Sequence, residues 1–444
     1  MKRIIFNFEH LKPVQIIILG FLCVILAGTL LLMLPAASRE AGSAGFADAL
    51  FTATSATCVT GLIVQDTISF WTPFGQAVIL SLIQIGGLGV ITVALSIAML
   101  SGKKIGLIQR NIMQESISAP QISGIVKFTK FILLTTFGAE GIGALVMMPV
   151  FIRKFGLLKG IWFSVFHSVS AFCNAGFDLM GGEQKYSSLT AFAGNPVVNI
   201  TIMVLIIFGG IGFLTWMDLA AHKFHFRKYR MQTKVILCMT AILIAVPALY
   251  FYFGEFSDAP SDRLLLSLFQ AVTPRTAGFN TADLTKLSDT GLFIMIILML
   301  IGGSPASTAG GMKTTTVAVL FASSAAVFKR KKFSSMFGRR IPSDSIQNAG
   351  AILLLYITLF SFGGMLISRI EGLPLIRCLF ETASAIGTVG LTTGITPGLS
   401  LLSRGILVFL MYVGRVGGLT LIFAAVSAGN PGKGILPEEK ITVG

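Results

Sequence analysis

Charged side chains are scarce in this sequence. They make up 12% of its 444 residues, about half of the roughly 25% that soluble domains carry. Hydrophobic residues account for 54%, and the mean hydropathy is +0.84. This composition excludes a soluble multi-domain enzyme.

Cysteine is also scarce and carries little information. Its scattered spacing argues against a disulfide framework and against a zinc site. Glycine, in contrast, is abundant at 48 residues, which suits closely packed membrane helices and non-helical backbone that lines a cavity. The five cysteines are Cys23, Cys58, Cys173, Cys238 and Cys378.

Eight apolar segments are long enough to cross a membrane as helices, which takes about 20 residues. Six of them contain no charged residue, and the other two contain only Glu140 and Arg415. The predicted spans are Val14–Ser38, Thr67–Gly102, Phe131–Ile152, Tyr186–Met217, Val235–Gly254, Thr290–Met312, Ile346–Ser368 and Gly405–Gly429.

The positive net charge of +15 follows the loops between these spans. Eight spans place both termini on one side, and nearly all of the basic excess lies in the loops on that side, which include Lys103–Lys130, Lys223–Lys234 and Lys329–Arg340. Basic loops remain in the cytoplasm. We therefore expect cytoplasmic termini, and we attribute the charge to membrane topology rather than to nucleic-acid binding.

A short motif occurs four times at similar intervals. Each copy begins with Phe, has Ser or Thr four residues later, and ends in Gly followed by a large apolar residue. Four spaced copies predict four structural repeats, which we place at residues 1–127, 128–230, 231–342 and 343–444. The copies, of which the third is one residue shorter, are Phe51–Leu62, Phe166–Phe177, Phe269–Phe279 and Phe380–Leu391.

Each motif copy lies between two predicted spans. The apolar lead-in to the glycine, such as Gly45–Thr57 or Leu264–Thr273, would form a helix of about 18 Å, half a membrane. Each repeat is therefore predicted to be a span, a half-helix, an extended loop and a second span. Because extended backbone at membrane depth must line a water-filled cavity, the sequence predicts an all-α integral membrane protein. Its eight transmembrane helices would form a pseudo-tetrameric cation pore.

The residues up to each motif glycine are the predicted selectivity filter. A half-helix that ends there points its negative carboxyl end toward the pore, and loop carbonyl groups can replace the water around a cation. Glycine permits positive φ and close approach of four backbones. The alternative, that glycine only relieves helix crowding, fits one glycine better than four in register. The predicted K⁺-coordinating residues are Val59, Thr60, Gly61, Asn174, Ala175, Gly176, Thr276, Ala277, Gly278, Thr388, Val389 and Gly390.

A second glycine cluster follows each filter loop. Small residues at these places are predicted to let the second helices pack tightly behind the filter. The clusters are Gly86–Gly89, Gly209–Gly212, Gly302–Gly303 and Gly414–Gly418.

Two features break the fourfold pattern and predict a gate. In the third repeat, Gly302–Gly311 cannot hold a stable helix, because glycine costs about 1 kcal/mol and proline about 3 kcal/mol; a flexible loop below the filter is expected. In the fourth repeat Arg415 lies inside a span, where a charge costs at least about 2.5 kcal/mol. It is expected to repel cations or to anchor the loop through carbonyl groups, and a purely structural arginine is the simpler alternative. The predicted gate residues are Gly302, Gly303, Ser304, Pro305, Ala306, Ser307, Thr308, Ala309, Gly310, Gly311, Lys313 and Arg415.

Together these features resemble the Trk/Ktr/HKT superfamily of potassium transporters over nearly the whole chain. Thr388-Val389-Gly390 is similar to the Thr-Val-Gly of potassium-channel filters, and Val272–Phe279 and Gly414–Gly417 resemble the bacterial Ktr membrane subunit most closely. The resemblance implies K⁺ uptake across the bacterial cytoplasmic (inner) membrane. It also implies potassium selectivity, because serine at the position of Gly61 accompanies sodium preference in some plant relatives.

The resemblance also implies roles for the gate and for partners. The stretch Gly302–Thr316 matches the family's intramembrane gating loop, apart from Pro305, and Arg415 matches its gate arginine. Ktr membrane subunits form homodimers on a cytoplasmic ring of nucleotide-binding regulatory subunits. Since this sequence has no G-x-G-x-x-G after a strand, nucleotide is expected only on a separate regulatory subunit. No covalent cofactor is expected, and the basic loops are candidate docking or lipid-contact surfaces.

Three alternatives remain open at this point. The first is a sodium-preferring or sodium-coupled transporter of the same family. The second is an intramembrane enzyme, although His167 and Glu381 occupy half-helices of different repeats and have no paired nucleophile. The third is a structural subunit of a larger complex, against which four complete filters argue.

Overall fold

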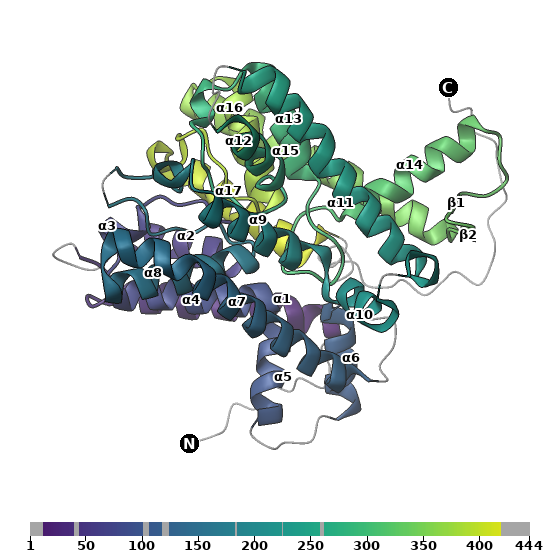
Figure 1. Ribbon diagram of the computed structural model, residues 1–444, viewed down its shortest axis with the longest axis horizontal. Helices are drawn as coiled ribbons and strands as arrows, with labels where there is room; N and C mark the ends of the chain where they lie inside the picture. The colour runs from purple at the N-terminus through teal and green to yellow at the C-terminus, as the bar shows by residue number, and fades with distance from the viewer. Residues whose placement is uncertain are drawn as a thin grey trace.

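A computed structural model describes residues 12–39, 44–100, 106–117, 124–182, 184–223, 225–257 and 262–418. These residues are predominantly helical (Figure 1). Within these ranges the only named strands are β1 (Ser335–Met336) and β2 (Arg339–Arg340), which form an antiparallel hairpin. The fold is therefore helical, as predicted, with one small hairpin that the sequence did not indicate.

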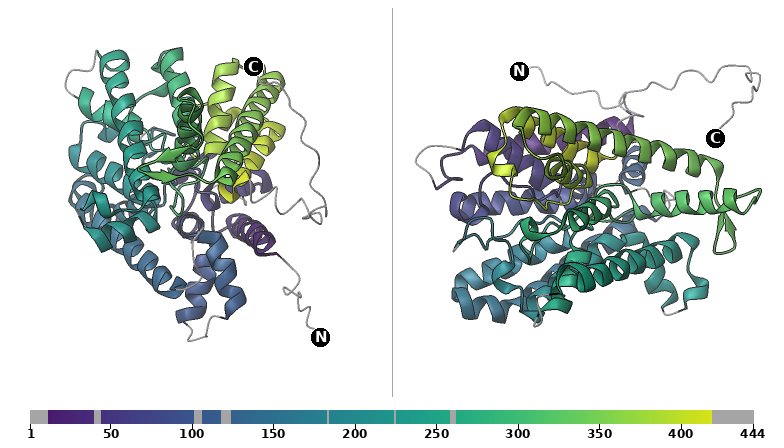
Figure 2. Two further views of the ribbon diagram at one scale, coloured as in Figure 1. Left: turned by 90° about the vertical axis from the view of Figure 1, so that its right-hand side faces the viewer. Right: turned by 90° about the horizontal axis from the view of Figure 1, so that it is seen from above.

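In the described part of the chain, four helices are long and apolar enough to cross a membrane: α1 (Pro13–Leu32), α7 (Ile125–Phe155), α11 (Met231–Tyr250), which continues into the π-helical turn η4 (Phe251–Glu255), and α15 (Ser343–Glu371). They run in a common direction through the body of the molecule, and α14 (Thr314–Phe328) with the β1–β2 hairpin projects at the end where they begin (Figures 1 and 2). We call this end the hairpin end.

Two further spans are bent, which the sequence did not indicate. Helix α4 (Pro73–Leu88) meets α5 (Val90–Leu100) at 98°, and α9 (Pro196–Ile211) meets α10 (Phe213–His222) at 93°. Both breaks occur at a glycine with positive φ, Gly89 at 87° and Gly212 at 97°, a conformation that other residues rarely adopt.

The predicted boundaries of the second spans also need correction. The spans predicted to begin at Thr67 and Tyr186 begin as helices only at Pro73 and Pro196. The span predicted over Thr290–Met312 contains α13 (Asp289–Leu300) and then non-helical backbone. The last one begins earlier than predicted, as α17 (Leu401–Val416), and residues 419–429 lie outside the described residues.

Four short helices lie between the long ones, and each contains the start of one motif copy. They are α2 (Phe46–Thr57), α8 (Leu157–Phe172), α12 (Arg263–Val272) and α16 (Leu375–Gly387). The smaller elements are α3 (Thr67–Phe70), α6 (Leu107–Ile117), η2 (Thr190–Phe192), η3 (Phe226–Lys228), η5 (Leu284–Lys286) and η6 (Thr396–Gly398).

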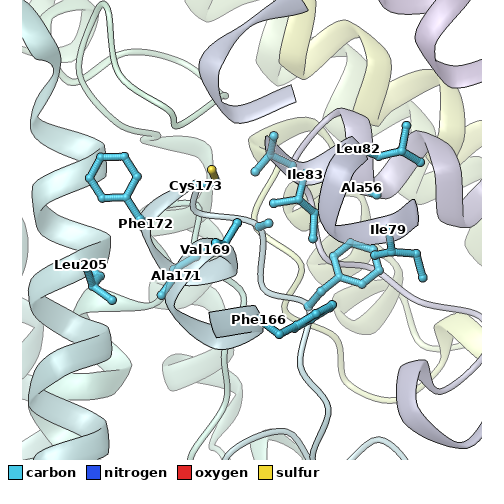
Figure 3. Packing of buried hydrophobic residues seen from close by; sticks show 14 of the residues in the cluster. Ala56, Ile79, Leu82, Ile83, Phe166, Val169, Ala171, Phe172, Cys173 and Leu205 are labelled. Atoms are coloured by element: carbon cyan, nitrogen blue, oxygen red, sulfur yellow. The ribbon is translucent and has the colours of Figure 1, made fainter. Parts of the chain in front are cut away.

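Close apolar packing fixes the short helices among the long ones. Figure 3 shows Phe166 and Val169 of α8 near Ile79 and Ile83 of α4, in one cluster of buried side chains. Many apolar side chains on the long helices stay exposed, such as Leu134 and Leu354. In a membrane these side chains would contact lipid, which is as apolar as they are, so the helices associate mainly through van der Waals contacts with one another. The four motif phenylalanines are all at most 1% exposed: Phe51, Phe166, Phe269 and Phe380.

Candidate functional site

The four motif glycines lie in a closed ring. A Cβ atom added at Gly61 would lie 2.5 Å from the carbonyl oxygen of Ala175, and one added at Gly176 would lie 2.7 Å from that of Ala277. In the same way Gly278 faces the carbonyl oxygen of Val389, and Gly390 closes the ring on that of Thr60, both at less than 3.0 Å. The structure therefore brings all four predicted filter segments together, in chain order around one axis.

The backbone of the ring has the same conformation in every segment. The residue two positions before each glycine has a positive φ of 52–64°, and each glycine has a positive φ of 69–94°. Positive φ costs non-glycine residues about 1–3 kcal/mol, and such strain concentrates at functional sites. Four repeats of the same strain point to a specific arrangement of the intervening carbonyl groups. The non-glycine residues with this conformation are Val59, Asn174, Thr276 and Thr388.

The serine or threonine of each motif copy fastens the ring to its short helix. Ser55 Oγ and Ser384 Oγ accept hydrogen bonds from the N–H groups of Gly61 and Gly390, at 3.1 and 3.0 Å. In the other two segments the hydroxyl donates instead to the carbonyl group after the glycine, from Ser170 to Phe177 and from Thr273 to Phe279. The motif contained this signal, but the sequence analysis gave these hydroxyl groups no role.

The predicted gate residues Gly302–Gly311 form a non-helical loop beside the ring, and Arg415 lies in α17. Ile301–Lys313 separates α13 from α14, and its N–H groups at Ser304 and Thr308 donate to the carbonyl groups of Gly210 and Gly209, at 2.9 and 3.3 Å. The hydroxyl group of Thr308 also donates to Asn174 Oδ1 of the ring, at 2.9 Å. The loop is thus held between the ring and the bend of α9–α10.

Arg415 joins this loop to the first bent span. Its guanidinium group donates to the carbonyl oxygen of Thr308 in the loop and to those of Gly86 and Gly87 at the end of α4, the last at 3.3 Å. Lys313 Nζ donates to the carbonyl oxygen of Ala309, 2.7 Å away. Both side chains therefore donate to carbonyl groups of the loop, which for Arg415 is the predicted anchoring arrangement.

A cavity of about 330 Å³ lies on the hairpin side of this loop. Its lining includes Arg415 and Lys313 together with Ala306 and Gly311 of the loop. Side chains from the middle of α1 and α15, such as Phe21 and Tyr356, complete the wall. The loop therefore separates the ring from a cavity that contains two cationic side chains.

Three of the four second glycine clusters pack against the carboxyl ends of short helices, as predicted, whereas Gly302 and Gly303 approach Gly310 and Ala309 of the gate loop instead. A Cβ atom at Gly86, Gly209 or Gly414 would overlap the carbonyl oxygen of Thr57, Phe172 or Ile386, respectively. Only glycine permits this approach, so the ends of α4, α9 and α17 lie directly behind the ring.

Two other residues raised by the sequence analysis lie outside the ring. The carboxylate of Glu140 accepts a hydrogen bond from Gln84 Nε2, at 3.4 Å, so it is held by a partner and does not extend toward the surface. His167 is fully buried and is surrounded by the rings of Phe151, Phe163 and Phe279.

Comparison with known proteins identifies the family. Residues 6–431 match the family model for TrkH, described as a cation transport protein. The chain belongs to the TrkH family of cation transport proteins. It is therefore a multi-pass membrane transporter and not an enzyme, and the intramembrane-enzyme alternative is rejected.

Curated relatives cover this TrkH-family chain almost completely. It is 39% identical over 448 residues to the potassium/sodium uptake protein NtpJ of Enterococcus hirae, and the alignment covers 98% of each chain. It is also 39% identical over 430 residues to the Ktr system potassium uptake protein B of Bacillus subtilis, covering 95% of each.

A solved structure has the same fold. The potassium transporter TrkH from Vibrio parahaemolyticus superposes with a TM-score of 0.74 at 19% sequence identity, covering 95% of this chain and 86% of that chain. At this identity the likeness concerns the fold alone.

Proposed function

We propose that this chain takes up potassium ions across the bacterial cytoplasmic membrane through the glycine ring. The observation that carries the proposal is the closed ring of Gly61, Gly176, Gly278 and Gly390, in which each glycine faces the carbonyl group of the next segment. Carbonyl oxygens replace the hydration shell of a monovalent cation. The predicted filter residues Val59–Gly61, Asn174–Gly176, Thr276–Gly278 and Thr388–Gly390 would coordinate K⁺.

The same proposal includes the four-repeat architecture. Each repeat, with the boundaries given above, would contribute a long helix, a pore helix that ends at the ring, a filter loop and a second span broken at its glycines. The hairpin end would face the cytoplasm, because it contains the basic segment Lys329–Arg340 and basic loops remain inside. Both termini would then be cytoplasmic.

The loop Gly302–Gly311, with Lys313 and Arg415, would be the gate. Two observations support this assignment of the gate: the loop lies between the ring and the cavity, and Arg415 forms hydrogen bonds to both the loop and α4. In this state the loop would limit conduction, and its release from Arg415 would increase it.

Partners follow from the relatives rather than from this chain's geometry. One relative is named as a protein of a Ktr system, which supports a separate cytoplasmic regulatory subunit as the place where nucleotide binds. A homodimer is the proposed state of the membrane subunit, with lipid around it. Cross-linking and mass measurement of the purified chain in detergent would test the dimer.

Cation flux into proteoliposomes tests the proposed function. The purified chain should conduct K⁺ and Rb⁺ well above Na⁺ when an inside-negative potential is imposed, which supplies about 2.3 kcal/mol per charge per 100 mV. Liposomes without protein are the control. Absence of potential-driven flux for all three ions, also in the Arg415→Ala variant with its gate loop released, would contradict the proposal.

A sodium-transporting variant is the second candidate. The observation in its favour is the name of the Enterococcus hirae relative, a potassium/sodium uptake protein. The same flux assay separates the two candidates, because equal Na⁺ and K⁺ flux would favour this one.

A further inference from the structure

The residue that follows the motif phenylalanine is polar and buried in all four copies. These residues are at most 2% exposed and none of them is a predicted filter residue. A buried polar side chain is costly unless it is hydrogen-bonded, so their partners indicate what they do. The four residues are Thr52, His167, Gln270 and Glu381.

Two of these side chains form hydrogen bonds with a residue that follows the motif glycine of the same copy by two or three positions. His167 Nε2 accepts a hydrogen bond from the N–H group of Leu179, at 3.3 Å, and its Nδ1 lies 2.7 Å from the carbonyl oxygen of Phe163. Gln270 Nε2 donates to Asn280 Oδ1, at 3.2 Å. Both interactions connect a short helix to its own filter loop.

Glu381 makes the most extensive set of such bonds. Its Oε1 accepts from the hydroxyl group of Thr392 at 2.5 Å and from the N–H group of Thr393 at 3.0 Å. Its Oε2 accepts from the hydroxyl group of Thr396 at 2.6 Å. These bonds use both oxygens of one side chain, and they begin two residues after Gly390. With the Ser384 bond to Gly390 on the other side, this filter segment is held at both ends.

Thr52 is the exception and provides an internal control. Within the described part of the chain its hydroxyl group has no hydrogen-bond partner. The first filter loop is held elsewhere, because Gln65 Nε2 donates to Asp48 Oδ2 at 2.9 Å and Arg404 donates to Asp48 Oδ1 at 2.8 Å. Position 52 thus has the location of Glu381 without its bonds.

We infer that Glu381 is a positioning residue that sets the preference of the ring for potassium over sodium. It fixes the carbonyl groups around Gly390 by holding the loop that leaves them, and it does not touch the ion. A ring that is held at fixed positions cannot contract around the smaller sodium ion, so loosening one of its four segments reduces discrimination. The inference rests on the proposed function, since it concerns the selectivity of the same filter.

The test measures the ratio of K⁺ to Na⁺ flux in proteoliposomes for variants of the full chain. Glu381→Ala should reduce the ratio at least about tenfold, the factor that corresponds to about 1.4 kcal/mol. Glu381→Gln keeps an acceptor oxygen for Thr392 and Thr393 and should retain the wild-type ratio to within about twofold, about 0.4 kcal/mol. Thr52→Val, the matched control, should leave the ratio unchanged.

The outcomes separate this inference from the function on which it rests. If the wild type prefers K⁺ and Glu381→Ala does so equally, the inference is wrong while the proposed function stands. If Glu381→Gln is as unselective as Glu381→Ala, the charge and not the hydrogen bonding matters, and the positioning role is wrong. If Glu381→Ala does not fold, the double variant Thr392→Val, Thr396→Val removes two of the bonds, and an unchanged ratio would again overturn the inference. A wild type without any preference for K⁺ would defeat the proposed function itself.

Discussion

Replacing Gly278 by alanine is expected to abolish potassium flux, because the ring has no space for a methyl group. The new Cβ atom would overlap the carbonyl oxygen of Val389 and would lie 3.2 Å from the Cα atoms of both Gly176 and Gly390. These neighbours are backbone atoms, which cannot rotate away as a side chain would. The φ of +76° at Gly278 adds about 1–2 kcal/mol of strain for a residue with a Cβ atom.

Relief of this overlap would move the Val389 carbonyl group out of the ring. We expect K⁺ flux to fall by at least about tenfold, since 1.4 kcal/mol already corresponds to that factor, and in practice to the level of empty liposomes. The fall is measured as rubidium or potassium flux into proteoliposomes that contain the Gly278→Ala variant or the wild type.

A glycine with open surroundings provides the control for this experiment. Gly141 lies on α7 with no atom within 4 Å of an added Cβ, so Gly141→Ala should conduct like the wild type. If Gly278→Ala is monodisperse and conducts equally well, the ring is not the conduction path.

The ring was predictable because its residues belong to a short sequence motif that occurs four times. The motif places a hydroxyl residue four residues and a glycine nine or ten residues after a buried phenylalanine, and every copy has positive φ at the glycine and two positions before it. For example, Ser55 and Ser384 make the same bond to Gly61 and Gly390. The sequence could not show which segment faces which, because the order around the ring depends on contacts between distant parts of the chain.

The bends at Gly89 and Gly212 were not predicted, because hydropathy does not distinguish a bent span from a straight one. A straight span and a bent one contain the same apolar residues, and the bend depends on how the glycines before it contact the ends of α2 and α8. The beginnings of these helices, however, had a local signal that was overlooked. Pro73 follows the N-cap Thr72 and Pro196 follows the N-cap Asn195, a common way for helices to begin.

The bonds of Glu381 illustrate a further limit of sequence analysis. Its partners Thr392, Thr393 and Thr396 are close in sequence. They contact Glu381, however, only because the filter loop reverses the chain direction and places them beside α16. Sequence alone showed only an isolated carboxyl group without a paired nucleophile.

Replacing Arg415 by alanine is expected to increase cation flux while leaving selectivity unchanged. The substitution removes the bonds that join Thr308 of the gate loop to Gly86 and Gly87 of α4. Hydrogen bonds to a charged group contribute about 1.5–3 kcal/mol each, so the loop should leave its position more often, with flux rising by about tenfold for every 1.4 kcal/mol lost. The filter residues are unchanged, and the ratio of K⁺ to Na⁺ flux should remain that of the wild type.

The variant Arg415→Lys distinguishes anchoring from electrostatic repulsion. Lysine keeps the positive charge beside the cavity, but it lacks the planar fork that reaches carbonyl groups on two elements at once. If Arg415 acts by repelling cations, the lysine variant should conduct as little as the wild type. If it acts by holding the loop, the lysine variant should conduct nearly as much as Arg415→Ala, and this is the result that we expect.

The matched control is Arg369→Gln, which removes an exposed arginine at the end of α15 and should leave flux at the wild-type level. Flux is measured at equal protein content for the wild type and for the three variants Arg415→Ala, Arg415→Lys and Arg369→Gln. Wild-type flux in both Arg415 variants would show that the bonds of Arg415 are not what holds the gate loop in place. The remaining contacts of Ser304 and Thr308 with Gly210 and Gly209 would then be sufficient to hold it.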